Sequence, residues 1–174
     1  SKEKIATNTL ALGAQQKNAL CFGFGHNLFL SPHIGDLISV AAEQYFHDTL
    51  ATFARLYRFQ AQQLVHDAHP DYMTTKWAIA NTNNNKVTVQ HHYAHVLSTL
   101  AANNSRTQVL AFAFDGTGLG DDHSLWGGEV FIADPINYRR IGHLSPFKLI
   151  GGEQAIKQPK RLLLAILVEK YSQQ

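Results

Sequence analysis

The sequence predicts a two-lobed α/β protein, because the same order of elements occurs twice along the chain. Three short apolar runs followed by a helical pattern occur near residues 9–58, and the same series returns near residues 109–171. Between the two series, short strands and helices alternate, as they do in α/β folds. We expect a first lobe with the order βββαβαβα over residues 1–106, and the start of a second lobe, βββα, over residues 107–174.

The first lobe begins with three expected strands at residues 9–12, 20–24 and 28–31, which are apolar runs separated by polar turns. From Asp36, the expected N-cap, apolar residues recur at intervals of three and four as far as Tyr57, which indicates an amphipathic helix. The later elements are expected as strands at 64–66 and 87–89 and as helices at 72–80 and 91–102.

The second lobe is expected to repeat this beginning. A strand at residues 109–114 leads into a glycine-rich turn, two strands follow at 126–133 and 138–144, and a helix starts near Pro159. Because the series stops after this helix, we expect the second lobe to be truncated. The first residue is not Met, which predicts that the chain is part of a longer protein.

Composition excludes several classes of protein. Hydrophobic residues make up 45% of the 174 residues and charged residues 16%, which is typical of globular chains. The formal net charge of +2 is too small for an electrostatic nucleic-acid binder. The longest apolar run, residues 162–168, is far shorter than the roughly 20 residues of a membrane-spanning helix. The single cysteine, Cys21, fits a reducing compartment. We therefore expect a cytoplasmic protein that binds neither nucleic acid nor a membrane.

Two histidines one helical turn apart form the clearest candidate site. His91 and His95 share one face of the helix expected over 91–102, and neutral imidazoles in this arrangement can chelate one Zn or Fe ion. His92 points elsewhere and is not an expected ligand. The spacing leaves an alternative open, a solvated histidine pair at a helix end, because H-x-x-x-H without a catalytic Glu is not specific.

A carboxylate at the end of a strand strengthens the metal hypothesis. Asp115 directly follows the apolar strand expected over 109–114, at a sheet edge where ligands gather. Two histidines and one carboxylate form a mixed nitrogen and oxygen donor set that suits Fe(II) or Zn and leaves positions open for substrate. The alternative is an Asp-Gly turn that begins a hairpin.

Two turns are candidate phosphate sites. Gly116, Thr117 and Gly118 lie in the glycine-rich turn, where backbone N–H groups can approach a phosphate closely. Lys17 and Asn18 lie in the corresponding turn of the first lobe, and Lys17 adds a positive charge. A lone lysine in a turn is usually just solvated, so the expectation depends on the pairing of the two turns.

Two further groups are ambiguous. His69, Asp71 and Tyr72 lie at a strand-to-helix junction, a common place for ligand contacts, although helix capping is the better explanation of Asp71 alone. Gly128 and Glu129 place a small residue beside a carboxylate, and close backbone packing explains the glycine equally well.

Taken together, these segments resemble the C-terminal domain of HypF, the carbamoyltransferase of NiFe-hydrogenase maturation. The matching motifs, in the order found in that family, are LALGAQ (10–15) with Lys17 and Asn18, HIGDL (33–37), HPDY (69–72), VQHHYAH (89–95), DGTG (115–118), GDD (120–122) and WGGE (126–129). The resemblance covers nearly the whole chain, and the combination is specific although each motif alone is not.

The resemblance implies a fold similar to that of TsaD, the tRNA threonylcarbamoyl transferase, in the actin-like ATPase or ribonuclease H-like superfamily. Two lobes of such a fold enclose a nucleotide and a metal. The resemblance further implies that His91, His95 and Asp115 are metal ligands, with another aspartate ligand beyond Gln174. It also implies that the turns at 116–118 and around Lys17 face nucleotide phosphates.

The resemblance implies a reaction as well. In the family, carbamoyl phosphate and ATP give carbamoyl-adenylate, and the carbamoyl group then passes to the C-terminal cysteine of the partner HypE. We therefore expect a divalent metal (Fe or Zn) and ATP or AMP, as carbamoyl-adenylate, to bind the full-length protein. The truncated chain alone is expected to lack complete transferase activity and to self-associate through the apolar residues at 162–168.

Three other functions stay open at this point. The first is a TsaD-type enzyme that transfers threonylcarbamoyl to tRNA, which the modest charge and the HPDY segment disfavour. The second is an O-carbamoyltransferase that uses the same metal and nucleotide chemistry on sugar hydroxyls. The third is a non-catalytic fragment in which the histidines form a metal-binding site without catalysis.

Overall fold

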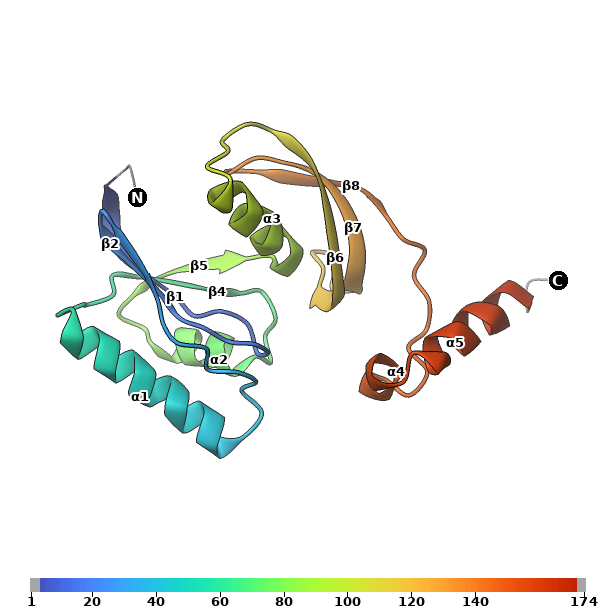
Figure 1. Ribbon diagram of the computed structural model, residues 1–174, viewed down its shortest axis with the longest axis horizontal. Coiled ribbons are helices and arrows are strands. Elements are labelled where there is room, and N and C mark those ends of the chain that lie inside the picture. Colours follow the sequence, from blue (N-terminus) through green and yellow to red (C-terminus); the bar gives the residue numbers. More distant parts are fainter. Residues whose placement is uncertain (1–3, 172–174) are drawn as a thin grey trace. The chain divides into compact units, whose positions relative to one another are not determined.

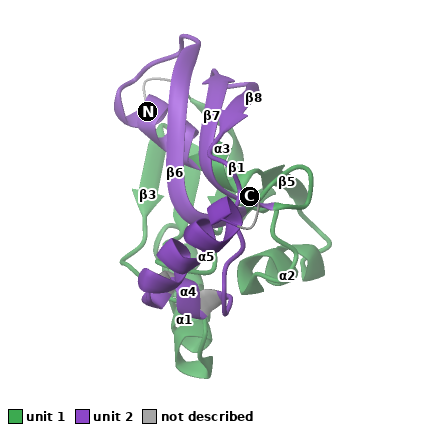
Figure 2. Cartoon of the chain, turned by 90° about the vertical axis from the view of Figure 1, so that its right-hand side faces the viewer, with its two compact units in different colours: residues 1–94, 119–124 green, residues 95–118, 125–174 purple. Residues whose placement is uncertain are grey.

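The computed structural model describes residues 4–171, which form two compact units coloured separately in Figure 2. Of the described residues, unit 1 comprises 4–94 and 119–124, and unit 2 comprises 95–118 and 125–171. The division falls within one continuous helix, α3 (His91–Ala102), so its first turn belongs to unit 1 and the remainder to unit 2. The lobe boundary expected after residue 106 stays a prediction.

Unit 1 is built on a five-stranded mixed sheet with the order β3-β2-β1-β4-β5 (Figure 1). Its strands are β1 (Ile5–Ala11), β2 (Cys21–Gly25), β3 (Asn27–Leu30), β4 (Gln63–Asp67) and β5 (Asn85–Val89). The first three strands pair antiparallel, whereas β4 runs parallel to β1 and β5 runs parallel to β4. A helix precedes both β4 and β5, as a parallel crossover requires.

Two helices cover one face of this sheet (Figure 1): α1 (Val40–Leu56) and α2 (Met73–Ala80). The fully buried Phe46 of α1 meets Trp77 of α2 edge-on, with ring centroids 6.0 Å apart. Phe46 belongs to a core that also contains Leu10 of β1 and Phe22 of β2. Each fully buried side chain of this size stabilises the fold by about 1.5–3 kcal/mol, so this core holds the sheet and helices of unit 1 together.

The start of α1 differs from the prediction. Its N-cap is Ser39, whose side chain accepts a hydrogen bond from the Ala42 N–H. Asp36, the expected cap, instead accepts a hydrogen bond from the backbone N–H of Lys17 at 2.9 Å. The carboxylate therefore supports the loop after β1, and a shorter side chain nearer the first helical turn caps α1.

Unit 2 contains a three-stranded sheet with the order β6-β7-β8. Its strands are β6 (Val109–Leu119), β7 (Leu125–Ala133) and β8 (Tyr138–His143), and β7 and β8 pair antiparallel. Two helices follow, α4 (Glu153–Lys157) and α5 (Lys160–Tyr171). None of the helices described within residues 4–171 has the length and apolar character needed to cross a membrane.

The glycine-rich segment after Phe114 is not the predicted turn. β6 continues through Asp115, Gly116 and Gly118 to Leu119, and the chain reverses only at residues 120–124. A Cβ atom on Gly127 of β7 would lie 3.1 Å from the carbonyl oxygens of Asp115 and Gly116. The absence of a side chain at Gly127 therefore lets the backbones of β6 and β7 approach closely. Gly116 and Gly118 are part of strand β6 and do not end it.

Candidate metal centre

Helix α3 begins directly after β5, and its first turn is fixed by Gln90. The buried Gln90 side chain accepts a hydrogen bond from the Tyr93 N–H at 2.8 Å, while its amide donates to the Leu119 carbonyl oxygen at 3.0 Å. The same amide lies 3.2 Å from Nδ1 of His92, which is fully buried. Gln90 therefore caps the helix and holds His92 inside, in agreement with the expectation that His92 points away from the metal candidates.

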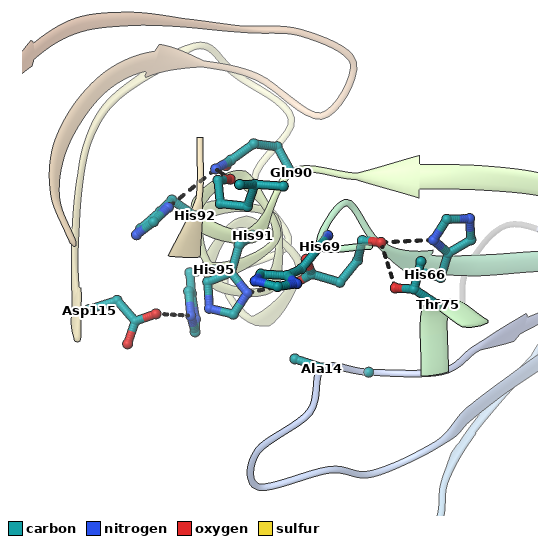
Figure 3. A network of polar contacts seen from close by, with 12 residues as sticks. Ala14, His66, His69, Thr75, Gln90, His91, His92, His95 and Asp115 are labelled. Carbon is teal, nitrogen blue, oxygen red and sulfur yellow. Dashed lines mark hydrogen bonds and ion pairs between the residues drawn. The ribbon is translucent and has the colours of Figure 1, made fainter. Parts of the chain in front are cut away.

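His91 and His95 lie one helical turn apart on α3, and Asp115 of β6 lies next to the second of them (Figure 3). The Nε2 atom of His95 is 3.7 Å from Oδ2 of Asp115. One ligand atom from each of the three residues lies within 4.8 Å of the other two. The structure thus brings together the three residues that the sequence predicts as metal ligands.

The separation of His95 and Asp115 suits two ligands better than a hydrogen-bonded pair. Zinc–nitrogen and zinc–oxygen bonds of about 2.1 Å at a tetrahedral angle place two ligand atoms about 3.4 Å apart. A charged hydrogen bond is about 2.7–2.9 Å long, well below the observed 3.7 Å. Asp115 is oriented by the Gly116 N–H, which donates to its Oδ1 atom at 2.7 Å, so Oδ2 is the oxygen that faces His95.

A second carboxylate, which the sequence did not indicate as part of this site, holds His91. The Nδ1 atom of His91 lies 2.7 Å from Oδ2 of Asp67, and both side chains are largely buried, at 14% and 7% exposed. Asp67 ends β4, and the parallel register pairs it with Val89, two residues before His91. The sequence does show an acidic residue, Asp67, at the end of the strand before α2. Its relation to His91 can be inferred only when β4 and β5 are known to pair in parallel.

The loop of residues 12–17, expected to face phosphate, is held to the start of α2. Gln15 accepts a hydrogen bond from the Met73 N–H at 2.8 Å through its side-chain oxygen, and its amide donates to the Leu37 carbonyl. Lys17 is exposed and adopts a left-handed φ of 48°. The buried Asn18 donates from its side chain to the carbonyls of Leu12 and Ala14, both at 2.7 Å, so its amide group shapes the loop.

His69, Asp71 and Tyr72 lie together between β4 and α2. The rings of His69 and Tyr72 stack with centroids 4.3 Å apart and an interplanar angle of 2°. Asp71 does not cap α2: Tyr72 occupies the N-cap position without a side-chain bond, because Gln15 supplies the acceptor from a distant loop. The exposed Asp71 carboxylate lies 3.4 Å from Lys76 instead.

Glu129 is engaged in packing within unit 2. It is 2% exposed, and its Oε2 accepts a 2.6 Å hydrogen bond from Nε of Arg140. Its Oε1 accepts from the N–H groups of Gly127 and Gly128, and the Arg140 guanidinium lies 4.1 Å above the Trp126 ring. These contacts give the WGGE motif a structural role, and its predicted contribution to nucleotide binding stays a prediction.

Cys21 is partly buried in β2. Burial in an apolar strand raises the pKa of its thiol above the ordinary value, since desolvation penalises the thiolate. A raised pKa lowers the fraction of thiolate at neutral pH, so Cys21 is poorly suited to act as a nucleophile.

The donor set itself fits a transition metal. Two imidazoles and one carboxylate are ligands that Zn and Fe(II) accept, and three protein ligands leave positions for water or substrate. His91 is in addition bonded through its other ring nitrogen to Asp67, the outer partner that metal-ligating histidines usually have. This second contact distinguishes the arrangement from a solvated histidine pair.

Family models match both parts of the chain. The model described as "HypF Kae1-like domain" matches residues 4–102, and the model described as "Carbamoyltransferase, Kae1-like Domain, second subdomain" matches residues 111–174. Among curated relatives, Carbamoyltransferase HypF of Synechocystis sp. is 41% identical over 159 residues, and Carbamoyltransferase HypF2 of Cupriavidus necator is 37% identical over 163 residues. These alignments cover 91% and 92% of this chain but 21% and 20% of the relatives. The chain thus spans about a fifth of their length.

Solved structures show the same fold. A crystal structure of full-length HypF in the phosphate- and nucleotide-bound form matches with a TM-score of 0.91 and 36% identity, over 98% of this chain and 23% of that chain. A crystal structure of HypF from T. kodakarensis matches with a TM-score of 0.84 and 32% identity, over 94% of this chain and 22% of that chain. Both similarities extend across unit 1 and unit 2, because they cover nearly all residues.

Proposed function

The chain belongs to the family of HypF Kae1-like domains, and from this membership we propose that it is part of a carbamoyltransferase. The proposed reaction passes a carbamoyl group from carbamoyl-adenylate, made from carbamoyl phosphate and ATP, to the C-terminal cysteine of HypE. The names of the curated relatives support carbamoyl transfer by the longer protein. The donor, the acceptor and a cytoplasmic location belong to the proposal.

The observation that carries the proposal is the convergence of His91, His95 and Asp115 around the first turn of α3. Metal binding accounts for several features at once: two histidines one turn apart, a carboxylate at 3.7 Å from His95, and a buried aspartate behind His91. A solvated pair of histidines would need neither carboxylate. The three residues would hold Fe or Zn through two imidazole nitrogens and one carboxylate oxygen.

The bound metal would supply a Lewis acid for the carbamoyl carbonyl oxygen. The residues of this chain that would hold the ion would also determine where that carbonyl binds. Gln90 caps α3 and so sets the direction of its first turn, and the Gly116 N–H orients the Asp115 carboxylate. Asp67 holds the His91 ring and the Gly116 N–H holds the Asp115 carboxylate, so these two donor side chains would need little rearrangement on binding.

We extend the proposal to the nucleotide. Lys17, on the exposed loop after β1, supplies a positive charge for phosphate oxygens, and the backbone of Gly116, Thr117 and Gly118 follows Asp115 directly. The stacked rings of His69 and Tyr72 offer a flat aromatic surface for a planar ligand group. The related full-length HypF structure is titled as a phosphate- and nucleotide-bound form, which supports nucleotide binding by the longer protein.

We also propose that unit 1 is an actin-like, ribonuclease H-like lobe. The support is its strand order, β3-β2-β1-β4-β5, with three antiparallel strands followed by two parallel ones. The complete enzyme would then be a two-lobed protein of which this chain supplies the first lobe and the beginning of the second. HypE would meet the longer protein, and the chain by itself would lack complete transferase activity.

The experiment that tests this function is elemental analysis of the purified chain beside a His91→Ala, His95→Ala double variant. We expect near-stoichiometric Fe or Zn in the wild-type chain and its loss in the double variant. A His47→Ala, His123→Ala variant is the matched control, because it removes two other histidines outside the candidate site and should keep the metal. Equal metal content in all three proteins would contradict the proposed centre.

A second arm tests the reaction. The longer protein, supplied with carbamoyl-adenylate and a peptide ending in the HypE C-terminal sequence, should form a thiocarboxamide on the terminal cysteine, and the His91→Ala, His95→Ala variant should not. Transfer to tRNA in place of the peptide would favour the TsaD-type alternative. Transfer to a sugar hydroxyl would favour the O-carbamoyltransferase alternative.

A further inference from the structure

Asp67 makes contacts that leave its carboxylate little freedom. Its backbone carbonyl oxygen accepts hydrogen bonds from the Thr75 hydroxyl at 3.0 Å and from Nδ1 of the buried His66 at 2.8 Å. Its Oδ1 atom accepts a bond from the backbone N–H of His69 at 2.8 Å. These contacts anchor both the main chain and one carboxylate oxygen, so Oδ2 is presented to His91 in a defined direction.

The contact between Oδ2 of Asp67 and Nδ1 of His91 determines which ring nitrogen carries the proton. An ionised carboxylate only accepts hydrogen bonds, so the 2.7 Å contact requires the proton of a neutral His91 ring to be on Nδ1. In that tautomer the lone pair available to a cation is on Nε2, the other ring nitrogen. The alternative tautomer would put two lone pairs against each other at Asp67 and a proton where a metal ligand is needed.

We propose that Asp67 is a positioning residue that holds the His91 ring in the Nδ1-protonated tautomer and so presents Nε2 to a divalent cation. This inference rests on the proposed function, because it concerns the same metal centre. Asp67 is not itself one of the proposed ligands. It ends β4, and the parallel pairing of β4 with β5 places it next to His91, the first residue of α3. Outer partners of this kind typically change metal affinity by roughly 10- to 100-fold.

The Asp67→Asn variant gives the sharpest test, because the His69 N–H dictates how an asparagine would sit. A backbone N–H is always a donor, so the side-chain oxygen of Asn at this position would face His69 and its NH₂ group would face His91. Nδ1 of His91 would then have to accept, and the proton would move to Nε2. The Asp67→Ala variant imposes neither tautomer, so it should bind metal more tightly than the Asn variant although it removes more atoms.

The first measurement is the tautomer of His91 in the metal-free chain, by two-bond ¹H–¹⁵N NMR at a pH about two units above the ordinary histidine pKa of about 6.5. The signal is assigned from its absence in His91→Gln. We expect Nδ1-protonated His91 in the wild-type chain and Nε2-protonated His91 in Asp67→Asn. An Nε2-protonated ring in the wild type, or the same tautomer in both proteins, would overturn the proposal.

The second measurement is Zn²⁺ affinity by competition with a chromophoric chelator. We expect a loss of roughly 10- to 100-fold for Asp67→Asn, a smaller loss for Asp67→Ala, and none for Asp48→Asn, which alters an exposed aspartate of α1. An Ala variant that binds as weakly as the Asn variant would overturn the orienting role. If the wild-type chain binds no Zn²⁺, the proposed metal centre fails, whereas the NMR measurement still decides the role of Asp67.

Discussion

The Nε2 atom of His95 lies 3.7 Å from Oδ2 of Asp115, too far for a strong hydrogen bond and close to the spacing of two ligands on one ion. These residues come from α3 and β6, so helix and strand each contribute part of the candidate site. The pair therefore adds a carboxylate from the following strand to the two histidines that lie one turn apart on α3.

Asp115→Asn should weaken metal binding by more than the roughly 10- to 100-fold typical of an outer partner, because it replaces a charged ligand with a neutral amide. Chelator competition measures this loss, with Asp48→Asn as the control that keeps wild-type affinity. Metal content and affinity unchanged in Asp115→Asn would remove Asp115 from the ligand set and leave His91 and His95 alone.

Arg140→Ala should destabilise unit 2, because it leaves the carboxylate of Glu129 buried without its cation. The expected cost is about 2–3 kcal/mol, below the 3–5 kcal/mol of a fully buried pair, since the Arg140 side chain is one quarter exposed. Urea unfolding measures the loss, and Arg139→Ala, an exposed neighbour, should change stability little. A folded Arg140→Ala protein of wild-type stability that loses nucleotide affinity would instead assign this pair to ligand binding.

Asp134 should make the β7–β8 turn sensitive to acid. The backbone N–H groups of Ile136 and Asn137 donate to its carboxylate and hold its pKa below the ordinary value of 3.8. A lowered pKa contributes stability above pH 3.8 that is lost as the pH falls through the folded-state value. Urea midpoints measured against pH should therefore separate the wild type from Asp134→Asn near neutrality and converge in acid. A constant gap across that range would show that the carboxylate charge contributes nothing there.

The apolar surface of α5 should cause the isolated chain to self-associate. Leu164 and Val168 lie four residues apart on this helix and are each 52% exposed, although both are large and apolar. Sedimentation velocity should show association that rises with concentration and falls in a Leu164→Lys, Val168→Lys variant. Glu169→Lys, an exposed change of similar size on the same helix, controls for charge. A wild-type chain that stays monomeric at high concentration would be evidence against this prediction.

The family and most of the helices and strands could be predicted from the sequence. The HypF-like motifs are confirmed by the two family models, and the predicted helix over 91–102 agrees with α3 at both ends. The spacing of apolar residues and the polar turns between apolar runs are local signals, which is why most predicted strands and helices begin and end within a few residues of the observed ones. The α/β class is confirmed, and the family models describe the chain as Kae1-like, whereas the actin-like assignment stays a proposal.

Two predictions were wrong because a group made a contact with a residue distant in the sequence in place of the expected local one. Asp36 has the chemistry of a helix cap, but the structure uses it on the Lys17 N–H and uses Ser39 for the helix. The DGTG segment has turn composition, but close approach to β7 keeps it in β6 as far as Leu119. Residue type alone could not predict these contacts, since each depends on which part of the backbone lies next to the residue in the folded chain.

The four-residue spacing of His91 and His95 is enough to place them on one face of α3, because a helix repeats every 3.6 residues wherever it lies. No local spacing predicts that Asp67, 24 residues earlier, holds the first of these histidines, or that Asp115 lies beside the second; folding brings them together. Those contacts depend on strand pairing, since the parallel register sets Asp67 opposite Val89, just before α3 begins. A tight turn can set the register of a hairpin, but β4 and β5 are parallel strands joined through α2, so their register depends on which face of each strand the folded sheet buries.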